Sequence, residues 1–214
     1  LTQKTANGSL IQSAAPLGLW DNVDHAKLVL VSLVRQLGSP IVSLQETGYR
    51  ADMFKTDDKG VTPAVSAVRY MADFADPVKP MYSWNRSQKS SRDAFLAGTL
   101  AMYFAPASEL KGLRAANPNL NFDVAPLPAT RGGGQDVAAE VTAVAIPRGS
   151  PNPVGALLVV TLFAAPDVEL QLAEELTLPS PRRDVEVDAS SDLYLSVFRT
   201  SALRSFSFLD PEPK

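Results

Sequence analysis

Apolar residues in the first part of the chain recur at the spacing of a helix. Between residues 22 and 37 they fall on every third or fourth position, which predicts a helix with one apolar face. Asn22 can cap the start of this helix, and Gly38 followed by Pro40 should end it. The expected apolar stripe consists of Val23, Ala26, Leu30, Leu33, Val34 and Leu37.

Prolines and small polar residues predict the starts of further helices. Thr62 followed by Pro63 has the pattern of a cap with proline at the first helical position. The expected core face of that helix consists of Ala64, Val65, Val68, Met71, Ala72 and Ala75. Ser91 should cap a short helix that Gly98 closes. This and the other expected helices cover Arg92–Ala97, Pro106 to about Asn117, Val154–Ala164, Asp167–Glu175 and Asp192–Leu203.

Apolar runs between these helices predict buried strands. Ser9–Leu19, Leu100–Ala105 and Asn121–Leu127 are expected to be strands of one sheet, and Val137–Ile146 is a further apolar strand. Interleaved helices and strands without a fixed repeat favour an α/β layered fold. We therefore expect a mixed, mostly parallel sheet flanked by helices.

Composition narrows the class of protein. The 214 residues are 45% hydrophobic and 20% charged, which is ordinary for a folded globular chain and argues against disorder. The formal net charge of −3 provides no basic field for nucleic acid. No apolar run reaches the ~18–20 residues that span a bilayer, so no transmembrane segment is predicted. The absence of cysteine excludes disulfides, thiolate zinc sites and thiol nucleophiles.

Motifs for catalysis and cofactor binding are missing from the sequence. Gly132-Gly133-Gly134 lacks the Lys-Ser or Lys-Thr of a phosphate loop, and there is neither a GxSxG elbow nor an HExxH pair. The single histidine, His25, is expected in the first turn of a helix, where a surface position is the common case. We expect no cofactor, no metal site and no catalytic residue.

Aromatic residues beside turns are the features that best indicate a function. Trp20 follows an expected strand, and Tyr82 and Trp84 lie in a loop bounded by prolines. Sugars present apolar faces and hydroxyl edges, so flat aromatic rings with polar neighbours suit them. The alternative is that each ring fills the core, which is the more common role of a single aromatic residue. The loop positions of Trp20 and Trp84 favour binding.

The segment Ala94–Phe104, with the sequence AFLAGTLAMYF, resembles a hallmark of carbohydrate-type extracellular solute-binding proteins of ABC importers. Asn121–Pro128 resembles a strand of this family that ends in a Pro-Leu-Pro element. Leu178–Asp184 is similar to its Pro-Ala-Arg segment, Tyr82–Asn85 to a segment of some members, and Leu1–Gly8 to the lead-in to its second lobe. The order and spacing of these short motifs cover essentially the whole chain.

The resemblance implies a periplasmic-binding-protein-like (type II) fold, in which two lobes close around a ligand by hinge motion. Residues 1–136 would form most of the second lobe, and residues 137–180 would form a hinge crossing and helices of the first lobe. Residues 181–214 would return to the second lobe. Counterparts of the family's first strand and last helices are missing, so we expect the chain to be an internal piece of a longer protein.

The same resemblance implies a function. The protein would bind an extracellular sugar or oligosaccharide in the cleft between its lobes and deliver it to the membrane permease of an ABC importer. It would be an extracytoplasmic, non-catalytic binding protein, in the periplasm or as a cell-surface lipoprotein. Two other interpretations stay open: an α/β enzyme acting on a small polar substrate, and a protein-interaction domain that uses the loop aromatics.

Six residues are candidates for ligand contact. Trp20 and Trp84 are expected to stack on a sugar, and Asp21 is expected to accept hydrogen bonds from its hydroxyl groups. Ser108 is expected near the start of the helix opened by Pro106, where the first backbone N–H groups need acceptors. The full set is Trp20, Asp21, Tyr82, Trp84, Ser108 and Phe208.

Overall fold

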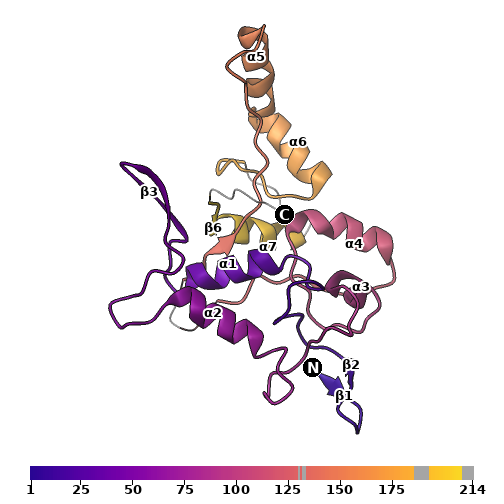
Figure 1. Cartoon of the computed structure of the whole chain (residues 1–214). Coiled ribbons are helices and arrows are strands. Elements are labelled where there is room, and N and C mark those ends of the chain that lie inside the picture. Colours follow the sequence, from indigo (N-terminus) through magenta and orange to yellow (C-terminus); the bar gives the residue numbers. More distant parts are fainter. Residues whose placement is uncertain (130, 132–133, 186–192, 209–214) are drawn as a thin grey trace.

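The computed structural model describes residues 1–129, 131, 134–185 and 193–208, and it consists of helices with short two-stranded sheets (Figure 1). Helix α1 (Ala26–Gln36) packs against α2 (Pro63–Ala72). Among the described residues, α1 contributes to each of the three clusters of buried apolar side chains. Helix α1 is therefore the centre of the core, and its Val34 has no exposed surface.

Helix α1 has the predicted apolar character but begins later than expected. The residue before its first turn is His25, whose φ of 58° is left-handed, and not Asn22. The side chain of Asn22 is used elsewhere, as described below. The predicted end of the helix is confirmed, because Gly38 has a φ of 95° and its N–H donates to the Arg35 carbonyl at 2.9 Å. Leu37 is 40% exposed and lies outside the core.

The helices predicted from prolines are present. Helices α5 (Pro153–Phe163) and α6 (Pro166–Leu176) each begin at their proline. The side chain of Asn152 caps α5 by accepting a hydrogen bond from the Gly155 N–H at 2.9 Å. Proline suits these positions because its fixed φ is helical and its missing N–H has no partner in the first turn. The helix opened by Pro106 is a 3-10 turn, η1 (Ala107–Glu109), continued by α4 (Leu110–Ala116).

Two further helices are also confirmed, with differences in detail. Helix α3 (Ser91–Leu96) is capped by Ser90, whose hydroxyl accepts from the Asp93 N–H at 3.1 Å, and not by Ser91. Helix α7 (Leu193–Ala202) fits the expected range, of which Asp192 lies outside the described residues. The predicted core face of α2 was partly wrong: Val65 and Val68 are exposed, and the buried positions are Pro63, Ala64, Ala67 and Met71.

The expected single sheet is not present among the described residues. The strands instead pair as three separate two-stranded sheets, two antiparallel and one parallel. The antiparallel pairs are β1 (Gln3–Lys4) with β2 (Leu10–Gln12) and β3 (Val42–Gln45) with β4 (Gly48–Ala51). The parallel pair is β5 (Val137–Ala138) with β6 (Ser205–Phe206).

The predicted strands are therefore shorter than expected or absent. Only residues 10–12 of Ser9–Leu19 form a strand, Val137–Ile146 is reduced to β5, and Asn121–Leu127 contains no strand. Proline supplies part of the physical reason, because Pro16 and Pro126 have no N–H to donate to a ladder. The expected strand Leu100–Ala105 is also absent, and Leu100 makes only an isolated parallel bridge with Ser13.

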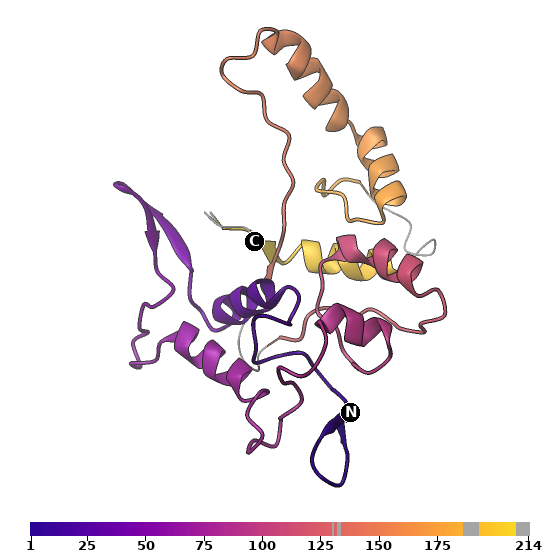
Figure 2. The ribbon, with the colours of Figure 1, turned by 45° about the vertical axis from the view of Figure 1, so that its right-hand side comes forward.

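Helices α5 and α6 form an arm that extends away from the rest of the molecule (Figures 1 and 2). Helix α5 has no buried residue, and its apolar side chains face solvent. Within the described residues no single helix is long and apolar enough to cross a membrane, whereas α5 and α6 together reach that length and composition but are bent by 63° at their junction. We call this pair the α5–α6 arm.

Candidate functional site

Trp20 is a solvent-exposed aromatic ring just before the central helix. Its side chain is 56% exposed, and Asp21 beside it is also exposed. Gly18 fixes where this segment lies, because its φ is 97° and a Cβ there would come 2.7 Å from the carbonyl oxygen of Met71 in α2. Only glycine fits such a conformation and such an approach. The structure thus presents Trp20 and Asp21 together at the surface.

Trp84 has a different environment, since its side chain is fully buried. It packs in the cluster that holds Val23 and Leu100, and its indole N–H donates to the Asn22 side-chain oxygen at 3.0 Å. A covered ring has no face to offer a sugar, so the structure places Trp84 in the core.

Asn22 joins the Trp20 segment to the loop that carries Trp84. Besides accepting from the indole, its side-chain amide donates to the carbonyl oxygens of Asn85 at 3.0 Å and Gln88 at 3.1 Å. We call this arrangement the Asn22 clasp. The sequence suggested only a helix cap for Asn22, and no local pattern reveals bonds to residues more than sixty positions away. The clasp brings together two of the segments predicted to bind ligand.

Tyr82 lies half-buried on the same loop. Its hydroxyl oxygen accepts from the Asn85 side-chain amide at 2.8 Å, and the Lys4 ammonium lies 4.8 Å from the ring centroid. A cation over the face of an aromatic ring is attracted by the ring quadrupole. One face of Tyr82 is therefore already occupied by Lys4.

A hydrogen-bonded polar group lies behind this surface, centred on Glu109. Its carboxylate is 2.6 Å from Nε2 of His25, accepts from the Tyr103 hydroxyl at 2.9 Å, and is 3.7 Å from Nε of Arg92. Burial, together with the hydrogen bond and charge of Glu109, raises the pKa of Tyr103. Sequence analysis missed this group because His25 and Glu109 are 84 positions apart.

The Glu109 group is suited to holding segments together. It connects the residue before α1, the end of η1 and helix α3, which come from distant parts of the chain. A second carboxylate, that of Asp24, accepts from the Ser91 hydroxyl at 2.9 Å and the Arg92 N–H at 2.8 Å. Both carboxylates thus accept hydrogen bonds from other segments of the chain and join those segments.

Replacing Glu109 by glutamine should lower the free energy of unfolding by about 1–2 kcal/mol. Hydrogen bonds to a charged group contribute about 1.5–3 kcal/mol when buried, and this side chain is 23% exposed. Urea unfolding followed by circular dichroism measures the change. Glu140→Gln, at an exposed position of the chain, is the matched control and should leave stability unchanged. Equal stability of both variants would mean that the Glu109 group contributes nothing.

The remaining candidates, Ser108 and Phe208, lie in different surroundings. Ser108 is exposed in η1, next to Glu109, and its hydroxyl is open to solvent. Phe208 is partly buried and packs against the cluster that contains Val31 and Ile41, which is not the cluster of Trp84. The structure therefore does not place Phe208 with Trp84 and the Asn22 clasp.

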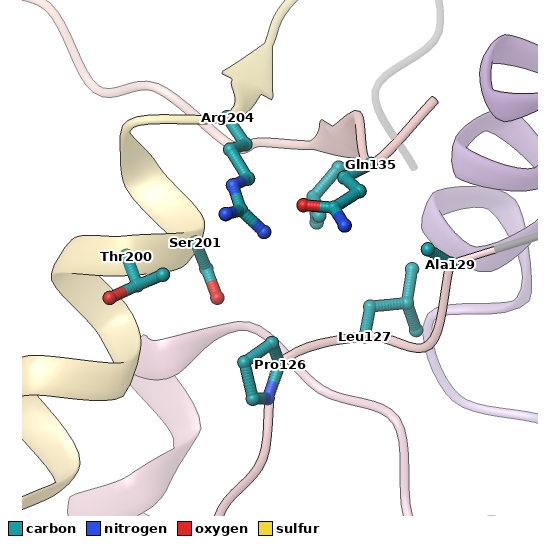
Figure 3. A pocket seen from close by; sticks show the side chains of 8 residues that line it. Pro126, Leu127, Ala129, Gln135, Thr200, Ser201 and Arg204 are labelled. Atoms are coloured by element: carbon teal, nitrogen blue, oxygen red, sulfur yellow. The ribbon is translucent and has the colours of Figure 1, made fainter. Parts of the chain in front are cut away.

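A small cavity of about 180 Å³ opens at a different place, between α7, the segment around Leu127 and β5. Figure 3 shows the guanidinium of Arg204, the hydroxyl of Ser201 and the amide of Gln135 directed toward one space above Pro126 and Leu127. None of the six predicted residues lines this cavity. In the described part of the chain, no group of three or more His, Cys, Asp or Glu side chains could hold a metal ion.

Comparisons with known proteins identify relatives by sequence pattern and by fold. A solved structure of an ABC transporter solute-binding protein from Thermotoga lettingae TMO, bound with alpha-D-tagatose, is similar with a TM-score of 0.58 and 18% identity. The match covers 91% of this chain and 48% of that one, so this chain spans about half its length. A search of curated proteins gave no match.

The family comparison covers most of the chain. The model of the bacterial extracellular solute-binding protein family matches residues 14–169, which include the Trp20 segment, the Asn22 clasp and helix α5. The fold of the solved solute-binding protein agrees with this assignment. The chain belongs to the bacterial extracellular solute-binding protein family.

Proposed function

We propose that this chain supplies one wall of a sugar-binding site in a two-lobed protein that delivers its ligand to the permease of an ABC importer. The family match over residues 14–169 is the observation that carries the proposal. The exposed pair of Trp20 and Asp21 supports it, because an aromatic face beside a carboxylate suits the apolar face and hydroxyl edge of a sugar. Tagatose is the first sugar to test, since a similar solved protein was found with it.

The six candidate residues have different roles in this proposal. Trp20 stacks on the sugar, Asp21 accepts from its hydroxyl groups, and the exposed Ser108 hydroxyl adds a further hydrogen bond. Trp84 and Tyr82 support the site without contacting the sugar. The Asn22 clasp and the Asn85 side chain tie their loop to the Trp20 segment. Phe208 packs against a different buried cluster from Trp84, so we assign it a contact with a part of the ligand that lies away from Trp20.

The division of the chain into lobes is part of the same proposal. Residues 1–136 and 181–214 belong to the second lobe, and residues 137–180 cross to the first lobe, where the α5–α6 arm packs. The exposed apolar surface of α5 supports this, since a helix that is apolar on all sides is normally interior. The protein then works outside the cytoplasm, soluble in the periplasm or tethered as a lipoprotein, without catalysing a reaction. The mostly parallel sheet forms when both lobes are complete.

Replacing Trp20 by alanine should weaken sugar binding by about 1–2 kcal/mol, or roughly 5–30-fold in Kd, because a stacking ring contributes beyond its buried area. Isothermal titration calorimetry of the two-lobed protein against a sugar panel that includes tagatose measures this. The matched control is Tyr49→Ala, since Tyr49 is a similarly exposed aromatic, 64% exposed, on the β4 strand of a different hairpin.

Three results would count against the proposal. If no sugar in the panel binds the two-lobed protein, the function itself is wrong. If Trp20→Ala binds with unchanged affinity while remaining folded, the ring lies outside the site. If Tyr49→Ala weakens binding as much as Trp20→Ala, the loss does not come from stacking at this position.

A further inference from the structure

The cavity beside Arg204 has the chemistry of a binding site that the proposed sugar site does not explain. It is lined by one cationic side chain, polar side chains and apolar walls, and its described lining contains no acidic side chain. Its about 180 Å³ is less than the ~300–1,000 Å³ of pockets for drug-sized ligands. The ligand that fits is therefore a small molecule, or one end of a larger one.

Hydrogen-bond donors from three elements converge on this space. The hydroxyl of Ser201 points into it from the last turn of α7, the guanidinium of Arg204 from the turn between α7 and β6, and the amide of Gln135 from the segment before β5 (Figure 3). An ionised carboxylate has only acceptor atoms, and a guanidinium fork matches its two oxygens. No ion pair joins Arg204 to a carboxylate in the described part of the chain, so its charge is available.

The backbone holds Arg204 in position from both sides. Its N–H donates to the Ser201 carbonyl at 3.1 Å, and its carbonyl accepts from the Val137 N–H at 3.2 Å in the parallel pair of β5 and β6. The nearby carboxylate of Asp136 does not neutralise it, because Asp136 is paired with Arg35 at 2.9 Å. The guanidinium therefore extends from a fixed point over the cavity.

A buried glutamine fixes the opposite wall. The Gln36 side-chain amide, in a residue that is 2% exposed, donates to the carbonyl oxygens of Pro128 at 3.4 Å and Asp136 at 3.1 Å. The backbone carbonyl of Gln36 accepts from the Gly134 N–H at 3.1 Å. The two segments that carry Leu127 and Gln135 are thus tied to the end of α1. Hydrogen bonds therefore hold this wall of the cavity in place.

We propose that this cavity binds the carboxylate of a small organic acid. Arg204 pairs with the two oxygens, Ser201 and Gln135 donate further hydrogen bonds, and Pro126 and Leu127 contact the carbon skeleton. The site is separate from the Trp20 surface, because it lies at the end of α1 where Gln36 is, and Trp20 lies before the first turn of that helix. The 11 residues of α1 place these ends about 16 Å apart. The proposal does not rest on the proposed sugar-binding function.

Binding of two matched sugars to the 214-residue chain tests the proposal. Glucuronate and glucose differ in a carboxylate that replaces a hydroxymethyl group, and acetate and inorganic phosphate are the further probes. We expect glucuronate and acetate to bind, with chemical shift changes at residues around Arg204, and glucose to leave these residues unchanged. Arg204→Gln should weaken carboxylate binding about tenfold or more, because a charged hydrogen-bond pair is lost.

A matched variant separates the site from general charge. Arg69→Gln removes the same charge from an exposed position of α2 and should leave carboxylate binding unchanged. Arg204→Gln should fold as the parent does, which circular dichroism checks, and Ser201→Ala should weaken binding by a smaller factor. The proposal is overturned if neither carboxylate binds, if phosphate alone binds, or if Arg69→Gln and Arg204→Gln weaken binding equally.

Discussion

Replacing Trp84 by alanine should lower the free energy of unfolding by about 3–5 kcal/mol, the range for removing a large aromatic side chain from a core. The indole has no exposed surface, and its removal leaves a cavity between Val23 and Leu100. It also leaves the Asn22 side-chain oxygen without its 3.0 Å donor. Since folded domains are stable by only about 5–15 kcal/mol, much of the stability would be lost. Urea unfolding followed by far-ultraviolet circular dichroism measures the loss.

Trp20→Ala is the matched control for this experiment, because it removes the same side chain from a position that is 56% exposed. Its effect on stability should stay within about 0.5 kcal/mol. Trp84→Phe should recover part of the loss, since it fills the cavity but has no indole N–H. A loss below about 1 kcal/mol for Trp84→Ala would show that the ring is not packed as described.

The two tryptophans show where sequence reasoning reached its limit. Both lie in segments without regular structure and next to turn residues, so their local patterns are alike. Trp84 is buried because Asn22, 62 positions earlier, accepts from its indole and ties down its loop. Trp20 is exposed because Gly18 leads the chain past α2 to the surface. Local sequence cannot reveal either long-range contact. It could therefore propose both tryptophans as candidates but could not predict which one is exposed and which one is buried.

Helix positions were predicted well, and strand positions were not. A proline favours the first helical position because of its fixed φ and its missing N–H, which are properties of that residue alone. The starts of α5 and α6 can therefore be predicted from a few neighbouring residues. A strand needs a partner that is distant in sequence. Ser13 pairs with Leu100, and β5 pairs with β6. Asn121–Leu127 pairs with no strand among the described residues.

The cavity beside Arg204 was also beyond prediction. Its donors come from residues 135, 201 and 204, and the glutamine that holds one wall is at position 36. Nothing in the spacing of these residues indicates that they meet. Gln135 comes just before an expected strand and Arg204 just after an expected helix, and neither lies in a motif. The parallel pairing of β5 with β6 and the hydrogen bonds of Gln36 bring them together.

Replacing Leu158 and Leu162 of α5 by lysine should leave the stability of the 214-residue chain unchanged but destabilise a two-lobed protein. In the 214-residue chain the two side chains are 69% and 61% exposed, so the change should leave stability within about 0.5 kcal/mol and reduce self-association. In a two-lobed protein, where we propose that α5 is covered, the same change should cost about 4 kcal/mol or more, because each buried leucine contributes about 2–5 kcal/mol. Sedimentation and urea unfolding measure the two effects.

The difference in stability loss between the two forms tests whether the first lobe covers α5. The exposed apolar side chains of Leu157, Leu158 and Val159 follow one another at about 100° around α5, so a single flat contact cannot bury them all. Leu44→Lys, at a leucine that is 72% exposed on β3, is the matched control and should change stability in neither form. If the double lysine variant is equally stable in both forms, the first lobe does not cover α5, and the proposed crossing at residues 137–180 is wrong.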